Sequence, residues 1–178
     1  MTRGALALCL SIVLTQLTSC GARRTPSDPS NTSEARQNKI ENLYQGYRQA
    51  FPNVNEVSPQ GVLDLKSTGP TILVDVRTPK EQAVSMLPSA ITQDAFEAAR
   101  EKYRHHTIVT YCTIGARSGE YAETLRQDGL EVFNLRGSLL AWTHAGLPLV
   151  DGEGEPTKSV HTYGNRWNLV ADGYEATW

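Results

Sequence analysis

The sequence predicts an α/β fold, an open parallel sheet flanked by helices in a single domain. Three short runs rich in β-branched residues, at 71–76, 105–111 and 131–135, are typical of strands buried on both faces of a sheet. Segments with helical spacing of apolar residues separate these runs, and such alternation is the pattern of parallel α/β sheets. The length of 178 residues fits one domain of this kind with appendages.

Start and stop signals bound the expected helices. Apolar residues at helical spacing occupy residues 40–51, and Pro52 ends that run. Ser58 followed by Pro59 is typical of a capped helix start, and Gly69 breaks the helix that follows. Further helices are expected at residues 93–103, 118–127 and 138–145.

Composition and charge exclude some partners. Apolar residues make up 39% of the chain and charged residues 20%, a globular balance. The net charge of -2 lacks the basic excess of nucleic-acid-binding domains, so we expect no nucleic-acid partner. The histidines show no metal-ligand spacing, so we expect no metal and no cofactor; they are His105, His106, His144 and His161.

The first nineteen residues have the layout of an export signal. Arg3 precedes an apolar run of 13 residues that ends at Leu17. A helix of that length is about 20 Å long, less than the roughly 30 Å hydrocarbon core, so a permanent membrane span is disfavoured. Leu17-Thr18-Ser19-Cys20 resembles the bacterial lipobox, in which the cysteine is lipidated and becomes the mature N-terminus.

These features predict an exported lipoprotein anchored to the membrane at the cell envelope through Cys20. In a bacterium with two membranes, the resemblance implies the periplasmic side of the outer membrane. A cleavable signal with a chance cysteine is the alternative. Residues 20–38 are polar and rich in Pro and Ser, and we expect them to form a flexible tether before a lead-in helix within residues 39–55.

The cysteine count singles out Cys112. Cys9 lies within the expected signal and Cys20 is the expected lipidation site, so the mature chain keeps one thiol. A lone thiol in an exported protein is consistent with reactivity, although free cysteines are also common as inert buried residues.

Cys112 directly follows an expected strand, at the end where open parallel sheets bind ligands. Three features favour its thiolate form: inward backbone N–H groups of the loop, the positive end of the following helix, and a nearby arginine. The loop that supplies them consists of Thr113, Ile114, Gly115, Ala116, Arg117 and Ser118.

Four segments in order resemble the rhodanese family of sulfurtransferases. Cys112-x-x-Gly115-x-Arg117-Ser118 is similar to its active-site loop, and Asp75-Val76-Arg77 to its first signature. Glu81 stands where an acid usually follows, and residues 135–148 resemble the closing motif. The resemblance covers residues 56–150.

This resemblance implies an enzyme in which Cys112 takes up a sulfane sulfur as a persulfide. The donor would be thiosulfate or a persulfide, and the acceptor a thiol or cyanide. Arg117 would bind the anionic donor, and the N–H groups of residues 113–118 would hold the transferred sulfur. Asp75, Arg77 and Glu81 are expected to act as supports. Bonding of Asp75 to the loop backbone and pairing of Arg77 with Glu81 are one alternative, and a structural role in securing a strand end is favoured for Asp75 and Arg77.

Two departures from the family pattern concern the surroundings of the loop. Met86 stands where the family usually has histidine, and Arg136 where a glycine is common, which would alter the cleft wall. A noncatalytic rhodanese-fold module that binds a partner or carries sulfur is one alternative function. A cysteine-dependent phosphatase or arsenate reductase is disfavoured, because related phosphatases have a longer loop than the four residues between Cys112 and Arg117.

A C-terminal extension, residues 151–178, follows the expected domain. It is rich in aromatic residues, including Trp167, Tyr174 and Trp178. We expect these residues to pack over the domain or line its entrance, and a surface for a protein partner is the alternative.

Overall fold

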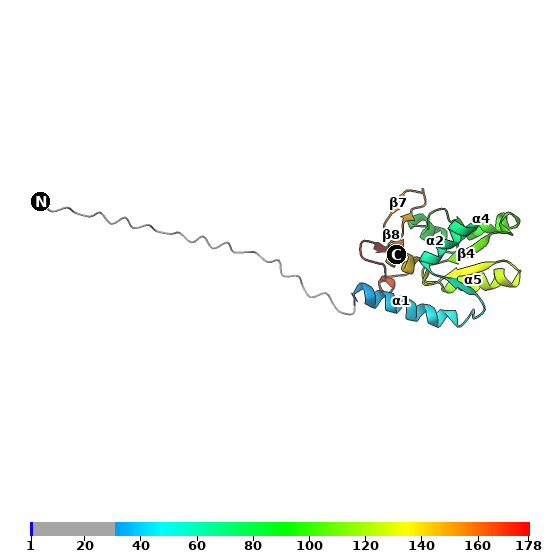
Figure 1. The fold of residues 1–178 in the computed structure, drawn as a ribbon, viewed down its shortest axis with the longest axis horizontal. Coiled ribbons are helices and arrows are strands. Elements are labelled where there is room, and N and C mark those ends of the chain that lie inside the picture. The colour runs from blue at the N-terminus through cyan, green and yellow to red at the C-terminus, as the bar shows by residue number, and fades with distance from the viewer. Residues whose placement is uncertain (2–30) are drawn as a thin grey trace.

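A five-stranded parallel sheet with helices on both faces forms the centre of the computed structural model, which describes residue 1 and residues 31–178 (Figure 1). The strand order is β1-β5-β4-β2-β3. The strands are β1 (Asn55–Val57), β2 (Thr71–Asp75), β3 (Ile91–Thr92), β4 (Thr107–Tyr111) and β5 (Val132–Leu135). The helices are α1 (Ser33–Arg48), α2 (Pro59–Thr68), α3 (Pro79–Val84), α4 (Gln93–Ala98), α5 (Ala116–Gln127) and α6 (Ser138–His144). The predicted fold class is confirmed.

Two apolar clusters lie on opposite faces of the sheet. On one face, Phe96 of α4 and Leu125 of α5 pack with Val74 of β2. On the other, Val62 of α2 and residues of α6 pack with Leu73, the neighbour of Val74 in β2. Successive strand residues point to opposite faces, so a strand covered by helices on both sides must be apolar throughout. This explains the continuous β-branched runs of the sequence.

Helix α1 begins earlier than the sequence indicates. Its first residue is Ser33, inside the segment 20–38 that we expected to be a tether. Thr32 caps the helix through its side chain, and Arg36 forms an ion pair with Asp172 at 2.5 Å. The first turn of α1 is polar and shows no helical spacing of apolar residues, so the sequence did not predict it. Its helical conformation is stabilised by the Thr32 cap and by the contact of Arg36 with Asp172.

The predicted helix at residues 93–103 is divided in two. Helix α4 ends at Ala98, and a 3₁₀ helix, η2 (Arg100–Tyr103), follows a non-helical Ala99. The break lets the Tyr103 ring stack on Phe96, with centroids 5.7 Å apart. The short elements β1, α3 and β3 were not predicted, because each is too short to show a periodic pattern.

The C-terminal extension packs back onto the domain. This is the first of the two alternatives expected for it, the other being a surface for a protein partner. Strand β6 (Leu149–Val150) pairs with β7 (Pro156–Thr157), and β8 (Ser159–His161) pairs in parallel with β9 (Glu175–Thr177). Val160, Leu169 and Val170 are buried in the same cluster as α2 and α6. A second 3₁₀ helix, η3 (Asn165–Trp167), lies between β8 and β9.

The predicted signal at residues 1–19, except Met1, and the predicted lipidation site Cys20 lie outside the described residues. Within the part of the chain that the structure describes, no helix is long and apolar enough to cross a membrane.

Candidate functional site

Cys112 lies in the tight connection between β4 and α5. Strand β4 ends at Tyr111, and α5 begins at Ala116 after Gly115, whose φ of 105° lies in the left-handed region. This conformation turns the Gly115 N–H back toward the cysteine, and it donates to Cys112 Sγ at 3.1 Å. Because Cys112 is only 1% exposed, this amide provides much of the polar environment of the sulfur.

Replacing Gly115 with alanine is expected to distort the loop and destabilise the protein. A Cβ on Gly115 would lie 2.6 Å from Cε2 of Tyr44, a fully buried ring. With the strained φ, the expected loss in the free energy of unfolding is about 2–4 kcal/mol. Chemical denaturation measures it. Gly46→Ala is the control, because Gly46 is exposed within α1 with no atom near its Cβ position, so we expect a gain of up to about 1 kcal/mol. Equal effects of the two substitutions would contradict the proposed role of Gly115.

The first turn of α6 holds the loop of residues 112–118, here called the cysteine loop, in place through hydrogen bonds. Ser138 Oγ accepts a hydrogen bond from Cys112 N at 3.1 Å, and Leu139 N donates to Cys112 O at 3.3 Å. Ser138 has a φ of 47°, an uncommon value for a residue with a side chain. From the sequence, Ser138 was predicted only as the start of a helix, although it lies in the segment that resembles the closing motif.

Asn134 of β5 joins three elements behind the loop. Its Nδ2 donates to Gly115 O at 2.9 Å and to the Tyr44 hydroxyl at 3.3 Å, and its Oδ1 accepts from Ser118 Oγ at 2.7 Å. All four groups are buried. The Ser118 side chain therefore faces the scaffold and not the space beside Cys112. No sequence signal marked Asn134, since an isolated asparagine in a strand has no recognisable pattern.

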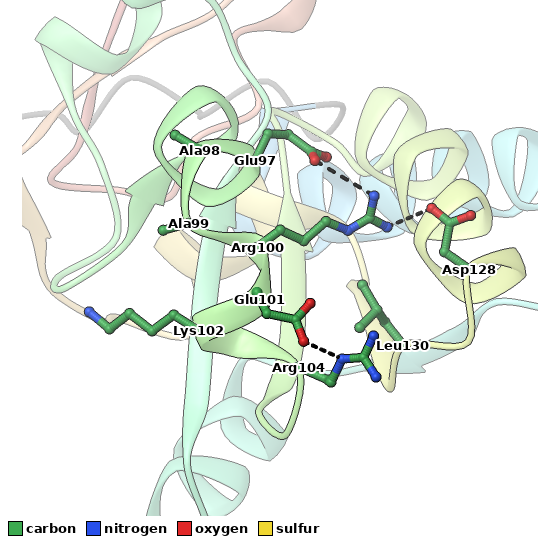
Figure 2. A pocket seen from close by; sticks show the side chains of 9 residues that line it. All are labelled: Glu97, Ala98, Ala99, Arg100, Glu101, Lys102, Arg104, Asp128 and Leu130. Atoms are coloured by element: carbon green, nitrogen blue, oxygen red, sulfur yellow. Dashed lines mark hydrogen bonds and ion pairs between the residues drawn. The ribbon is translucent and has the colours of Figure 1, made fainter.

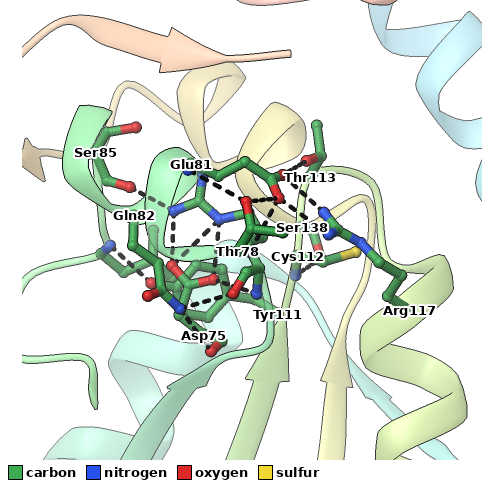
Figure 3. Close-up of polar contacts among 12 residues, drawn as sticks. Asp75, Thr78, Glu81, Gln82, Ser85, Tyr111, Cys112, Thr113, Arg117 and Ser138 are labelled. Atoms are coloured by element: carbon green, nitrogen blue, oxygen red, sulfur yellow. Dashed lines mark hydrogen bonds and ion pairs between the residues drawn. The ribbon is translucent and has the colours of Figure 1, made fainter. Parts of the chain in front are cut away.

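Glu81 and Arg117 form an ion pair beside Cys112 (Figure 3). Arg117 Nη2 donates to Glu81 Oε1 at 2.8 Å, and Nη1 donates to Oε2 at 3.0 Å. Glu81 occupies the third position of α3 and completes a capping box with Thr78, which orients its carboxylate. Of the two alternatives for Arg77, its pairing with Glu81 does not occur, because the capping box directs Glu81 toward the cysteine loop.

The charges of this pair are strongly stabilised. Burial on its own would raise the pKa of Glu81, but hydrogen bonds from Arg117 and Thr78 outweigh it and lower the pKa to about 2. Burial would lower the pKa of Arg117, and the hydrogen bond to Glu81 raises it instead. Both groups are ionised over the whole physiological range.

Glu81→Gln is expected to make the free energy of unfolding less sensitive to a fall in pH. The folded-state pKa of Glu81 lies below its ordinary value of 4.5, so the stabilisation is complete above pH 4.5 and is lost as the pH falls toward 2. We expect the substitution to cost about 2 kcal/mol at neutral pH after solvent screening, and the difference from wild type to vanish near pH 2. Urea denaturation across pH measures both. A pH-independent difference would contradict the ion pair.

Asp75 and Arg77 form a second ion pair, which is buried in the interior. Both side chains are fully buried, and Arg77 donates to Asp75 through Nε at 2.9 Å and Nη2 at 2.6 Å. Arg77 also donates to the Ser85 carbonyl. The Asp75 carboxylate accepts from the Arg77 backbone N–H at 3.0 Å and not from the cysteine loop, so of the two alternatives for this residue the contacts agree with the favoured structural role. The pair fixes the end of β2 to the end of α3.

A cavity of about 200 Å³ opens beside Cys112. Its lining combines the cysteine loop with aromatic side chains from both ends of the chain, Tyr47 of α1 and Tyr163 and Trp167 of the C-terminal extension. The remaining lining residues are Thr113, Ile114, Ala116 and Arg117. Trp167 was expected to pack over the domain or line its entrance, but Tyr47 and Tyr163 were missed because aromatic residues at such positions usually serve the core.

A larger hollow of about 520 Å³ lies between η2 and the end of α5 (Figure 2). Its lining is mainly charged, and most of the charges are paired: Arg100 pairs with Asp128 at 2.6 Å, and Arg104 with Glu101 at 2.8 Å. It lies near the starts of β4 and β5, whereas parallel α/β sheets bind ligands at the opposite ends of their strands. Among residues 31–178, no cluster of three or more His, Cys, Asp or Glu side chains is arranged for a metal ion.

The two departures from the family pattern occupy structural positions. Met86 forms a backbone bridge with Val150, in which Val150 N donates to Met86 O at 3.0 Å. Arg136 points to α1 and pairs with Glu41, with a 3.0 Å contact from Nε. Arg136 does not line the cavity beside Cys112, so it ties α1 to the domain and does not alter the cavity wall.

Comparison with known proteins agrees with this geometry. Residues 58–145 match the rhodanese-like domain family. A protein named sulfurtransferase from Allochromatium vinosum is 38% identical over 106 residues, which cover 57% of this chain and 99% of that protein. An uncharacterised protein of Synechocystis is 35% identical over 56% of this chain and 58% of its own length.

The thiosulfate sulfurtransferase from Pseudomonas aeruginosa, a solved structure, has a similar fold. The TM-score is 0.53 at 18% identity, and the match covers 65% of this chain and 23% of that one. This likeness therefore concerns the fold alone. The residues matched to the family, 58–145, include the cysteine loop and both ion pairs. Tyr47, Tyr163 and Trp167 lie outside them.

Proposed function

This chain belongs to the rhodanese-like family, and from that premise we propose that it is a sulfurtransferase that carries a sulfane sulfur on Cys112. The observation that supports this most is the Gly115 N–H donated to Cys112 Sγ at the floor of a cavity at the carboxyl end of β4. The amide donor and the start of α5 turn the positive ends of their dipoles toward the sulfur, whereas the charge of Arg117 is paired with Glu81. The same groups stabilise the terminal sulfur of a persulfide anion.

The proposed reaction has two displacement steps. The Cys112 thiolate attacks the outer sulfur of a donor such as thiosulfate or a persulfide, the S–S bond of the donor breaks, and sulfite or a thiolate leaves with the bonding electron pair. An acceptor thiolate or cyanide then attacks the outer sulfur of the Cys112 persulfide. The products are a new persulfide or thiocyanate and the regenerated Cys112 thiolate.

Sustained turnover distinguishes an enzyme from a module that only binds sulfur or a partner. The experiment supplies the full chain with thiosulfate or glutathione persulfide and with cyanide, and measures thiocyanate. We expect thiocyanate in molar excess over protein with at least one donor. A yield that stops at one thiocyanate per chain would indicate a sulfur carrier, and no reaction with either donor would contradict sulfur transfer.

We also propose that Cys20 anchors the protein at the cell envelope through a lipid. Support comes from the sequence, where Cys20 follows an apolar run and two small residues. Expression of the full chain and of Cys20→Ala in a bacterium, followed by membrane fractionation, tests it. We expect the full chain in the detergent-soluble membrane fraction and the variant outside it. Equal partition of both would contradict lipidation.

A further inference from the structure

We propose that the preferred sulfur donor is an organic persulfide with an uncharged, apolar substituent, and not a dianion such as thiosulfate. This inference rests on the proposed sulfur transfer through Cys112 and names the donor class of that site. Two independent features of the cavity carry it: the neutralised charge of Arg117 and the aromatic walls.

The cavity offers a charged donor no unpaired cation. Arg117 has the only positively charged side chain among the residues that line it. Both terminal nitrogens of Arg117 already bond to the carboxylate of Glu81. The pair is neutral as a whole, so a thiosulfate dianion would meet the negative charge of the Cys112 thiolate without compensation from Arg117.

The walls favour an apolar substituent. Tyr47, Tyr163 and Trp167 present aromatic surface, and Ile114 and Ala116 add aliphatic surface. Tyr163 is 55% exposed at the cavity, and its ring lies over the Arg117 guanidinium at 5.0 Å. The ring therefore lies against the one cationic group of the lining, and the rest of its exposed surface is available to an apolar ligand. An exposed aromatic side chain in such a position gains free energy when an apolar group covers it.

These aromatic residues are a feature of this chain's own extensions. Tyr47 comes from α1, and Tyr163 and Trp167 come from the segment after β8, whereas the family match covers residues 58–145. The core domain supplies the reacting sulfur and the Glu81–Arg117 pair. The extensions supply the surface that selects the substituent. A volume of about 200 Å³ is roughly that of six or seven water molecules and is sufficient for a small ring or a short alkyl chain.

The transfer from such a donor is balanced in atoms and charge. The Cys112 thiolate attacks the terminal sulfur of R–S–SH, a new S–S bond forms to Cys112, and the donor S–S bond breaks. The proton stays on the transferred sulfur, giving Cys112–S–SH, and R–S⁻ leaves. The single negative charge moves from Cys112 to the departing R–S⁻, so the neutral Glu81–Arg117 pair suits every stage.

Donor competition tests the inference on the full chain. The rate of persulfide formation on Cys112 is measured with benzyl persulfide, glutathione persulfide and thiosulfate, each divided by its rate with a free low-molecular-weight thiol. We expect benzyl persulfide to be favoured by about tenfold or more. Equal or faster reaction of glutathione persulfide or thiosulfate would overturn the donor class and leave sulfur transfer standing. No reaction with any donor would overturn sulfur transfer itself.

Three variants separate the two features. Tyr163→Ala should reduce the preference for benzyl persulfide several-fold, since it removes apolar wall from a half-exposed position. Glu81→Gln keeps the capping box but frees the Arg117 charge, so it should raise the relative rate with thiosulfate. Trp178→Ala is the control, because Trp178 is 61% exposed in the same extension and does not line the cavity. Unchanged preference in both Tyr163→Ala and Glu81→Gln, or an equal change in Trp178→Ala, would overturn the inference.

Discussion

Cys112→Ser abolishes persulfide formation and sulfur transfer while the fold stays intact. A serine hydroxyl is not ionised at neutral pH and does not form a stable persulfide equivalent, so activity should fall at least about 1000-fold. The serine Oγ can still accept the Gly115 N–H that Cys112 Sγ accepts at 3.1 Å, so the loop keeps its hydrogen bond. Thiocyanate production and the urea denaturation midpoint measure the two effects.

The other cysteines provide the matched control for this substitution. The sequence contains Cys9 and Cys20 besides Cys112. A chain with both of the first two replaced by serine should transfer sulfur at the wild-type rate in detergent-free solution. Transfer that survives Cys112→Ser, or disappears in the double variant, would contradict the assignment of the reacting sulfur.

Asp75→Ala causes the largest loss of stability that we expect from a single polar substitution. Burial on its own lowers the pKa of Arg77, and the Asp75 carboxylate raises it, so the guanidinium keeps its charge in the interior. Removing Asp75 leaves this buried charge without its partner, which costs about 3–5 kcal/mol. The free energy of unfolding from urea denaturation checks it.

The control for Asp75→Ala is Asp64→Ala, an exposed aspartate in α2. Its removal should change the free energy of unfolding by less than about 0.5 kcal/mol. Comparable losses in the two variants would show that the Asp75–Arg77 pair contributes no more than an ordinary surface carboxylate. Any residual Asp75→Ala activity should follow the folded fraction, because Asp75 contacts no residue of the cysteine loop through its carboxylate.

The arrangement of β4, Cys112 and α5 was predictable from local sequence. A β-branched run, a cysteine, a glycine and an amphipathic segment follow one another within 23 residues of chain at 105–127, and each has its own local signal. The Gly115 conformation follows from the tight turn between strand and helix. The predicted start at residue 118 was two residues late, because Ala116 and Arg117 already belong to α5.

The contacts that complete the site were not predictable, because they join residues distant in sequence. Ser138 reaches Cys112 across 26 positions, and Asn134 reaches Tyr44 across 90. The partner of Glu81 was not predicted for a similar reason: Arg77 is nearer in sequence, but Arg117 lies beside Glu81 in space. Local patterns describe elements well and describe the packing between elements poorly.

The cavity walls illustrate the same limit. Tyr47 belongs to a helix that the sequence predicted, and Trp167 to an extension that we expected near the entrance. Their meeting beside Cys112 depends on how α1 and the C-terminal extension pack on the domain. Arg36, which forms an ion pair with Asp172, ties those two segments together. Nothing in either segment alone indicates this contact.

The most direct test of the whole account is to locate the transferred sulfur. The full chain is exposed to a sulfane-sulfur donor, its thiols and persulfides are trapped by alkylation, and the digested peptides are identified by mass spectrometry. We predict one added sulfur atom on the peptide that contains Cys112, and its loss after incubation with cyanide. An unmodified Cys112 peptide, or added sulfur that cyanide cannot remove, would contradict the account.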